Sequence, residues 1–285
     1  MLMARSDPSS AHRVDREFAF TEKDFHEIRK LVAEHTGIAL SDAKRELVYG
    51  RLSRRLRVLG LSRFADYRAL LVQSDSPELG EFVNSVTTNL TAFFRERHHF
   101  DYFQETALPE LVRRKDMQRR LRFWSAGCST GAEPYSMAMV VAEFFANKPG
   151  WDVKILATDL DTNCLRSGQE GIYSVDQLRG VEAARLRKWF TRIEPNQFQA
   201  VDQLREMVVF NQLNLMKEWP MRGPMDAIFC RNVVIYFDKP TQQRIFNRFA
   251  ALMRPDEHLF IGHSESLYRV SDAFKLIGKT IYRRL

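Results

Sequence analysis

The chain has 285 residues, of which 45% are hydrophobic, and its formal net charge is +7. This length and hydrophobic content are enough for one large domain and a small one, each with a buried core. No apolar run approaches the length of a membrane span, and the N-terminus lacks the hydrophobic centre of a signal peptide. We therefore expect a soluble, cytoplasmic protein without direct membrane insertion.

The cysteines and histidines do not show the spacing of a metal site. Cys128, Cys164 and Cys230 form no C-x-x-C pair, so we expect buried thiols and neither a disulfide nor a structural zinc site. Seven histidines add only the adjacent pair His98-His99, whose side chains cannot both point inward from one helix. The sequence predicts no metal. The positive charge instead favours an acidic partner, which is a nucleic acid, an anionic membrane surface or a carboxylate-rich protein.

The N-terminal part predicts a small helical domain. Residues 1–17 are polar and predicted to be disordered, and residues 18–86 contain four short amphipathic segments with helix start and stop signals. The first begins after Thr21 and ends at Gly37, and the second runs from Ser41 to Gly60. The third begins at Ser62 and the fourth at Ser76-Pro77. Their apolar faces are able to bury one another.

The second helix has a basic flank. At ~100° per residue its apolar side chains Val48, Leu52, Leu56 and Leu59 share one face. Beside that face lie Lys44, Arg51, Arg54, Arg55 and Arg57. An ordinary solvated face mixes charges of both signs, but this segment contains no acid after Glu46. The pattern favours a docking surface for an acidic partner over a solvated face.

The rest of the chain predicts a doubly wound, Rossmann-like α/β sheet. Residues 87–120 form a linker with a polar run and then a helical stretch interrupted at Pro109. From residue 121 to residue 285 apolar strands alternate with helices, and the last segment predicts a hairpin at the sheet edge. An inserted β-containing subdomain is expected at about 171–212. It includes a basic helix at 183–190 and strands near 198–201 and 207–210.

A glycine turn follows the first predicted strand and precedes a helix. Gly127 and Gly131 lack the Cβ atom where the backbone must bend or approach a ligand, and Ser129 and Thr130 are candidate helix N-caps. The turn is neither a P-loop nor a complete G-x-G-x-x-G motif. With Glu133 beside it, it suits a positively charged cofactor without phosphate, such as S-adenosylmethionine. Alternatively, it is an ordinary strand-to-helix turn.

Two further strands carry polar residues to the same edge of the predicted sheet. Asp159 ends the second strand, where a carboxylate accepts hydrogen bonds from ribose hydroxyls, and Asp161 is the alternative helix cap. A later strand delivers Arg231, Asn232 and Tyr236 to its carboxyl end. The Asn/Asp-Pro-Pro-aromatic turn that methyltransferases use for amino groups is missing here, so the nucleophile need not be an amine.

Four motifs closely resemble the chemotaxis-receptor glutamate O-methyltransferases, the CheR family. They are the segment Thr87 to Arg95, the loop Trp124 to Ser136, Ala157-Thr158-Asp159 and the block Phe229 to Phe237. The resemblance extends over nearly the whole chain from Phe18. It implies an S-adenosylmethionine site lined by Asn89, Thr91, Arg95, Gly127, Glu133, Asp159, Asn214, Leu215, Arg231 and Asn232. It further implies that Arg95 and Tyr236 are the catalytic residues facing a receptor glutamate.

The resemblance also implies the partners. The basic helix would dock the cytoplasmic helical bundle of methyl-accepting chemoreceptors, and S-adenosylhomocysteine would be the product. Family members that tether to a receptor's C-terminal peptide carry a glycine-rich turn in the inserted subdomain. Residues 191–198 contain no glycine, so we expect no tether, and we expect a monomer. The alternatives are a nucleic-acid methyltransferase and a non-catalytic adaptor that senses S-adenosylmethionine.

Overall fold

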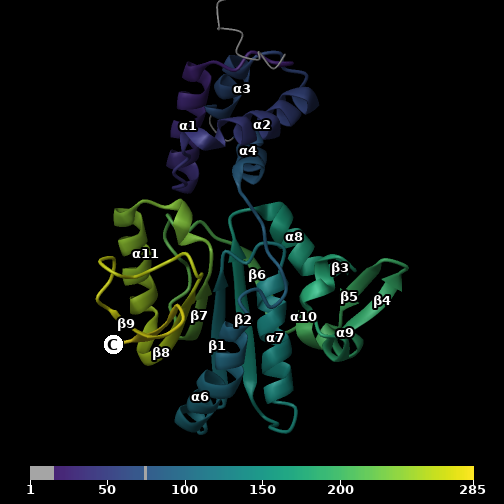
Figure 1. Ribbon diagram of the computed structural model, residues 1–285, viewed down its shortest axis with the longest axis vertical. Helices are drawn as coiled ribbons and strands as arrows, with labels where there is room; N and C mark the ends of the chain where they lie inside the picture. The colour runs from purple at the N-terminus through teal and green to yellow at the C-terminus, as the bar shows by residue number, and fades with distance from the viewer. Residues whose placement is uncertain (1–15, 74–75) are drawn as a thin grey trace, which may run out of the picture.

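The computed structural model describes residues 16–73 and 76–285, which form a small helical domain above a larger α/β domain (Figure 1). The helical domain contains the four predicted helices: α1 (Glu22–Thr36), α2 (Arg45–Leu59), α3 (Phe64–Leu71) and α4 (Glu78–Val86). They surround one apolar core in which Ile28, Leu52 and Phe82 are fully buried. Of the helices in the described ranges, none is both long and apolar enough to cross a bilayer.

The boundaries of this domain differ from the prediction at its N-terminal segment and at the starts of α2 and α3. The third helix begins at Phe64 with Arg63 as its N-cap, and not at Ser62. Ser41 makes no side-chain cap and precedes a short 3₁₀ turn (Asp42–Lys44), so α2 itself begins only at Arg45. Residues 1–15 of the predicted disordered segment lie outside the described residues. Arg16 and Glu17, the last two residues of that segment, have defined places because they form ion pairs with Glu46 and Arg57.

The larger domain is built on a seven-stranded sheet with the order β6-β2-β1-β7-β8-β10-β9. The parallel strands are β1 (Arg120–Ala126), β2 (Asp152–Asp159), β6 (Val208–Gln212), β7 (Met225–Cys230) and β8 (Met253–Ile261). The terminal hairpin, β9 (Phe274–Gly278) and β10 (Ile281–Arg284), adds antiparallel strands at one edge. The predicted doubly wound sheet is therefore confirmed.

Alternating side chains of the strands build two cores, one on each face of the sheet. Phe123 packs in the core that contains helix α7 (Ala132–Phe144), whereas its neighbour Trp124 packs in the core that contains helix α11 (Lys239–Ala251). This alternation is the expected period of a strand buried on both faces. Helix α8 (Thr162–Glu170) contacts β2 and β6 at the side of the sheet opposite the hairpin.

The lead-in helix is irregular, but not at the predicted proline. α5 (His98–Tyr102) continues through a π turn (Phe103–Ala107) into α6 (Leu108–Lys115). Pro109 stands in the first turn of α6, directly after the π turn. The helical stretch is therefore not interrupted at Pro109, and the π turn before it is the irregular part.

The inserted subdomain is smaller than predicted. It contains the three-stranded sheet β3-β5-β4, with short helical segments between β3 and β4 and after β5. Its elements are β3 (Ile172–Ser174), a 3₁₀ turn (Gln177–Gly180), α9 (Ala183–Trp189), β4 (Phe190–Glu194), β5 (Gln197–Ala200) and α10 (Asp202–Arg205). The strand predicted at 207–210 does not belong to it.

That strand is β6 of the main sheet. It pairs in parallel with β2 and places Ala157 opposite Phe210. Phe210 is buried against Gly168 of α8, where an added Cβ would lie 2.4 Å from the Phe210 ring. The side chains of Val208 and Phe210 alternate along β6 and are buried in the main core. The sequence of this short segment alone does not show whether the strand belongs to the main sheet or to a hairpin of the insert.

A buried polar cluster holds α2 and α4 together, and it predicts a stability effect. The Arg55 guanidinium donates to both carboxylate oxygens of Glu78 at 2.8 and 2.6 Å, and the buried Tyr67 hydroxyl donates to Oε1 of the same group at 2.8 Å. We expect Glu78→Ala to lower the free energy of unfolding by about 2–4 kcal/mol, because it leaves a buried hydroxyl and a largely buried cation unpaired.

Urea unfolding measures this effect, and Glu81→Ala is the matched control. The Glu81 carboxylate lies 3.4 Å from the same arginine but is half-exposed. We expect it to contribute less than ~1 kcal/mol. Equal losses in the two variants would show that the buried cluster does not stabilise the domain.

Candidate active site

One cavity lies at the carboxyl ends of β1, β2 and β7, the edge where open α/β sheets bind ligands. It encloses about 980 Å³ of empty space, a volume that includes its open mouth. Every residue predicted to bind the cofactor or to act in catalysis lines it: Asn89, Thr91, Arg95, Gly127, Glu133, Asp159, Asn214, Leu215, Arg231, Asn232 and Tyr236. The helical domain adds Thr36 and Ile38, which the sequence did not indicate.

The glycine turn forms one wall of the cavity. Gly127 has φ 80°, and a Cβ there would lie 2.3 Å from the Val233 side chain, so only glycine permits this approach. The predicted caps Ser129 and Thr130 are wrong, because α7 begins after Gly131 without a side-chain cap. Ser129 instead donates its N–H to Asp159 at 2.7 Å and its hydroxyl to the Asn89 carbonyl at 2.9 Å.

Asp159, the last residue of β2, and Asp161, two residues later, have different roles. Asp161 caps α8 by accepting from the N–H groups of Asn163 and Cys164, which confirms the alternative reading of that residue. Asp161 also accepts from the side chain of Asn89 at 2.6 Å. Asp159 accepts from two backbone N–H groups, those of Ser129 and Asp161, and it lines the cavity. Because a carboxylate has about four acceptor positions, Asp159 is the one that keeps capacity for a ligand.

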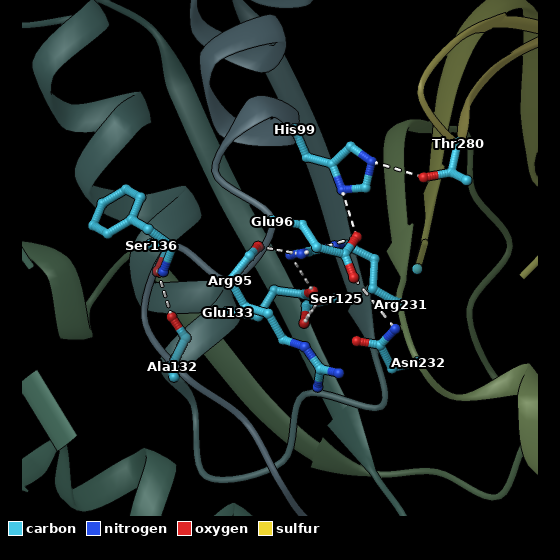
Figure 2. Close-up of polar contacts among 12 residues, drawn as sticks. Arg95, Glu96, His99, Ser125, Ala132, Glu133, Ser136, Arg231, Asn232 and Thr280 are labelled. Carbon is cyan, nitrogen blue, oxygen red and sulfur yellow. Dashed lines mark hydrogen bonds and ion pairs between the residues drawn. The ribbon is translucent and has the colours of Figure 1, made fainter. Parts of the chain in front are cut away.

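The buried Arg231 side chain lies among several polar partners at the site (Figure 2). The Arg231 guanidinium donates to Glu133 at 3.2 Å and to the Arg95 carbonyl, and it lies 3.5 Å from the Glu96 carboxylate. The Ser125 hydroxyl donates to the other oxygen of Glu133 at 2.7 Å. Burial raises the pKa of Glu133, and Arg231 beside it acts in the opposite direction. Glu133 is thus paired within the protein before any ligand binds.

Sequence reasoning missed Glu96, the second acid of this cluster. Glu96 has φ 55° and accepts from the His263 ring at 2.8 Å and from the Asn232 amide at 3.4 Å. The His99 ring lies 3.5 Å from it, and burial lowers the pKa of His99 to about 3. An acid directly after Arg95 was visible in the sequence, but its partners Asn232 and His263 lie more than a hundred positions further along the chain.

The mouth of the cavity lies where the two domains meet. The Ala39 N–H donates to the Tyr236 carbonyl at 2.9 Å, and the Asn214 side chain donates to the His35 carbonyl at 2.8 Å. Arg95 donates to the Leu90 carbonyl at 3.0 Å, which folds the 90–95 segment over the site. Both predicted catalytic residues therefore lie on segments that internal contacts hold in place.

The predicted basic docking surface is only partly free. Arg55 pairs with Glu78, Arg57 pairs with Glu17, and Arg51 donates to the carbonyls of Val86 and Thr87. Arg51 and Arg55 are thus engaged within the helical domain and its linker, whereas Arg57 stays exposed beside Glu17, and docking through the stripe remains a prediction. Lys44 and Arg54 are exposed.

Comparison with known proteins agrees with this geometry. Residues 23–87 match the family described as CheR methyltransferase, all-alpha domain, and residues 89–283 match CheR methyltransferase, SAM binding domain. The chain belongs to the CheR methyltransferase family. It is 44% identical over 98% of its length to chemotaxis protein methyltransferase 2 of Pseudomonas aeruginosa, 99% of which is covered. It is 44% identical over 93% of its length to the chemotaxis protein methyltransferase of Escherichia coli, 91% of which is covered. The protein is therefore an S-adenosylmethionine-dependent methyltransferase.

The residues of this CheR site fit S-adenosylmethionine. The Oδ1 atom of Asn232 is buried and has no hydrogen-bond partner among the described residues, so it is free to accept from an ammonium group. The Asp159 carboxylate lines the cavity and keeps acceptor positions of the kind that ribose hydroxyls need, and the Glu133 carboxylate lines the same cavity. Within residues 16–73 and 76–285, no three His, Cys, Asp or Glu side chains gather as metal ligands.

The Glu96 cluster predicts a dependence of stability on pH. Burial acts to raise the pKa of Glu96, but hydrogen bonds from His263 and the charge of Arg231 outweigh it and hold the pKa at about 2, below the ordinary 4.5. A carboxylate with a lowered pKa in the folded state stabilises the protein above its unfolded-state pKa. This contribution is lost as pH falls from about 4.5 towards 2.

We expect Glu96→Gln to be less stable than the wild type at neutral pH, with a difference that shrinks between about pH 4.5 and pH 3. Urea unfolding at a series of pH values measures it. Glu105→Gln, which changes an exposed carboxylate, is the control. A difference that stays constant across this range would contradict the assignment.

Proposed function

We propose that this CheR protein transfers the methyl group of S-adenosylmethionine to glutamate side chains of chemoreceptors and forms γ-methyl esters. The observation that carries the proposal is that Arg95 and Tyr236 line the same cavity as Asp159 and Glu133. A cationic and a hydroxyl side chain are thus present where a carboxylate substrate would meet a bound cofactor. The names of the relatives add that these proteins act in chemotaxis.

The proposed methyl transfer depends on positioning the carboxylate more than on proton transfer. A glutamate with its ordinary pKa of ~4.3 is already an anion at neutral pH, so its oxygen needs no general base. Bound S-adenosylmethionine supplies an electrophilic methyl group on a sulfonium centre. The Arg95 guanidinium orients the incoming carboxylate, and the Tyr236 hydroxyl donates a hydrogen bond to it. Such alignment lowers a barrier by up to ~7–11 kcal/mol.

The opposite wall holds the cofactor. Asp159 binds the ribose, and Asn232, Glu133 and the backbone of the glycine turn surround the charged amino-acid end. Asn89, Thr91, Asn214, Leu215 and Arg231 complete the lining, and S-adenosylhomocysteine leaves as the product. Because a carboxylate anion and a sulfonium cation lose their charges together, a cavity that excludes water favours this reaction.

The helical domain docks the cytoplasmic helical bundle of the receptor through the exposed Lys44 and Arg54, which lie on or beside α2. The enzyme works in the cytoplasm as a monomer and acts on no nucleic acid. The turn between β4 and β5 contains no glycine, so no C-terminal receptor peptide is tethered there. Specific, saturable binding of such a peptide to the inserted subdomain would contradict the last statement.

The deciding experiment is transfer of a labelled methyl group from S-adenosylmethionine to membranes that contain chemoreceptors, followed by mild alkali. We expect the label to enter the receptor and to leave it as volatile methanol, because esters hydrolyse in alkali and methylated amines do not. Label that resists alkali would indicate an amine. Label in added RNA or DNA would indicate the nucleic-acid reaction, and no transfer at all would indicate either an adaptor or a receptor that these membranes lack.

We expect substitutions at Arg95 and Asp159 to change different quantities, turnover for the first and cofactor affinity for the second. We expect Arg95→Ala to lower turnover at saturating cofactor by about 100-fold, since it misplaces the substrate carboxylate, with little change in cofactor affinity. Asp159→Asn removes a charge-assisted hydrogen bond worth ~1.5–3 kcal/mol and should weaken cofactor binding by about 10- to 100-fold. Calorimetry and initial rates measure both. An equal loss of cofactor affinity in Arg95→Ala would assign Arg95 to the cofactor.

We expect charge reversal at Arg54 to weaken binding of the receptor substrate. We expect Arg54→Glu to raise KM for the receptor several-fold and to weaken the dependence of KM on salt, because it removes an attractive charge from the docking surface. Cofactor affinity should stay unchanged. Arg113→Glu on α6, an exposed residue on the other domain, makes the same change in net charge and serves as the control. Equal KM values for the two variants would contradict docking through α2.

A further inference from the structure

Glu265 is a buried carboxylate for which the sequence predicted no role, and it does not line the cavity. It lies in the loop after β8, its residue is 5% exposed, and it forms no ion pair with any described residue. All of its hydrogen-bond donors are backbone N–H groups. A buried carboxylate without a cation is costly unless several donors satisfy it, so its place here calls for an explanation.

Five N–H groups converge on this one side chain. Oε1 accepts from Val233 at 2.8 Å, Val234 at 2.9 Å and Ile235 at 3.3 Å, and Oε2 accepts from Asn232 at 2.9 Å. The fifth donor is Gly262, at the end of β8. Four of the five donors are thus successive residues, and their N–H groups form a concave backbone site for an anion.

These four residues lead directly to the substrate side of the cavity. Asn232 adopts the left-handed conformation with φ 59°, and the chain then enters a 3₁₀ turn (Val234–Tyr236). Both Asn232 and Tyr236 line the cavity, whereas Glu265 is not among its lining residues. Glu265 therefore holds this segment from the side that faces away from the ligand.

The segment is also closely fitted to its surroundings. A Cβ on Gly262 would lie 1.9 Å from the side-chain amide nitrogen of Asn232, so only glycine allows the two loops to approach this closely. On the far side, the Ala39 N–H of the helical domain donates to the Tyr236 carbonyl at 2.9 Å. The conformation of Asn232 to Tyr236 is thus fixed at its start by Glu265 and at its end by the helical domain.

We propose that Glu265 is a positioning residue for methyl transfer: its carboxylate fixes residues 232–235, so that the Asn232 amide and the Tyr236 hydroxyl are presented to the cavity. This inference rests on the proposed function for the role of Tyr236. A glutamine cannot replace the carboxylate, because its NH₂ group would face N–H donors where an acceptor is required.

The test compares Glu265→Gln with Glu257→Gln in the full chain. Glu257 is also a buried carboxylate, lies on β8 and pairs with Arg114 at 3.2 Å, far from the cavity lining. The first readout is hydrogen exchange of the ligand-free protein. We expect the amides of residues 232–235 to exchange at least about tenfold faster in Glu265→Gln, and to exchange as in the wild type in Glu257→Gln.

The second readout is turnover at saturating cofactor, counted per cofactor-binding site by calorimetry. We expect Glu265→Gln to lose about tenfold or more in kcat, because misplacing a reacting group by less than 1 Å has effects of this size. A variant that was only less stable would lose binding sites and keep its kcat per site. Glu265→Asp, which keeps the charge and shortens the side chain, provides the same comparison if the glutamine variant does not fold.

Unchanged exchange at 232–235 together with a kcat per site within about twofold of the wild type would overturn the proposal. Failure of the proposed function is distinguishable from this. It would appear as a wild-type protein that forms no base-labile ester on receptors, and the exchange rates would then still decide whether Glu265 holds the segment.

Discussion

The buried guanidinium of Arg231 joins three segments that are distant in sequence. It contacts Glu133 at the start of α7, Glu96 and the Arg95 carbonyl in the linker, and it extends from the end of β7. Removal of either carboxylate would leave a buried cation incompletely paired, which typically costs ~3–5 kcal/mol. The linker that carries Arg95 is thus held against the sheet by a buried charge cluster, and the shape of the cavity depends on it.

A second constraint is that the site is shared between two domains. Thr36 and Ile38 of the helical domain line the cavity, and the Ala39 N–H reaches the Tyr236 carbonyl. This arrangement explains why a domain with its own core belongs to the catalytic unit, because it both supplies part of the site and carries the exposed basic residues.

Local signals in the sequence predicted the sheet and part of the cavity lining, and the resemblance to the CheR family supplied the other lining residues. Alternating apolar strands, the Gly127–Gly131 turn and Asp159 at a strand end are all read within a few residues of one another. The sequence did not predict the pairing of those residues. The sequence alone indicated a free surface charge at Arg55, but the structure pairs it with Glu78. The sequence likewise placed β6 in the insert, but the structure pairs it with β2. The sequence assigned no role to Glu265 because four of its five hydrogen-bond donors lie some thirty positions away.

The most direct test of this account is a crystal structure of the protein with S-adenosylhomocysteine bound. We expect the ribose hydroxyls on Asp159 and the sulfur near Arg95 and Tyr236. We expect the contacts among Arg231, Glu133 and Glu96 to be retained from the ligand-free protein, because they pair with one another without a ligand. A product bound outside this cavity, or bound in it with Arg231 withdrawn from both carboxylates, would contradict the account.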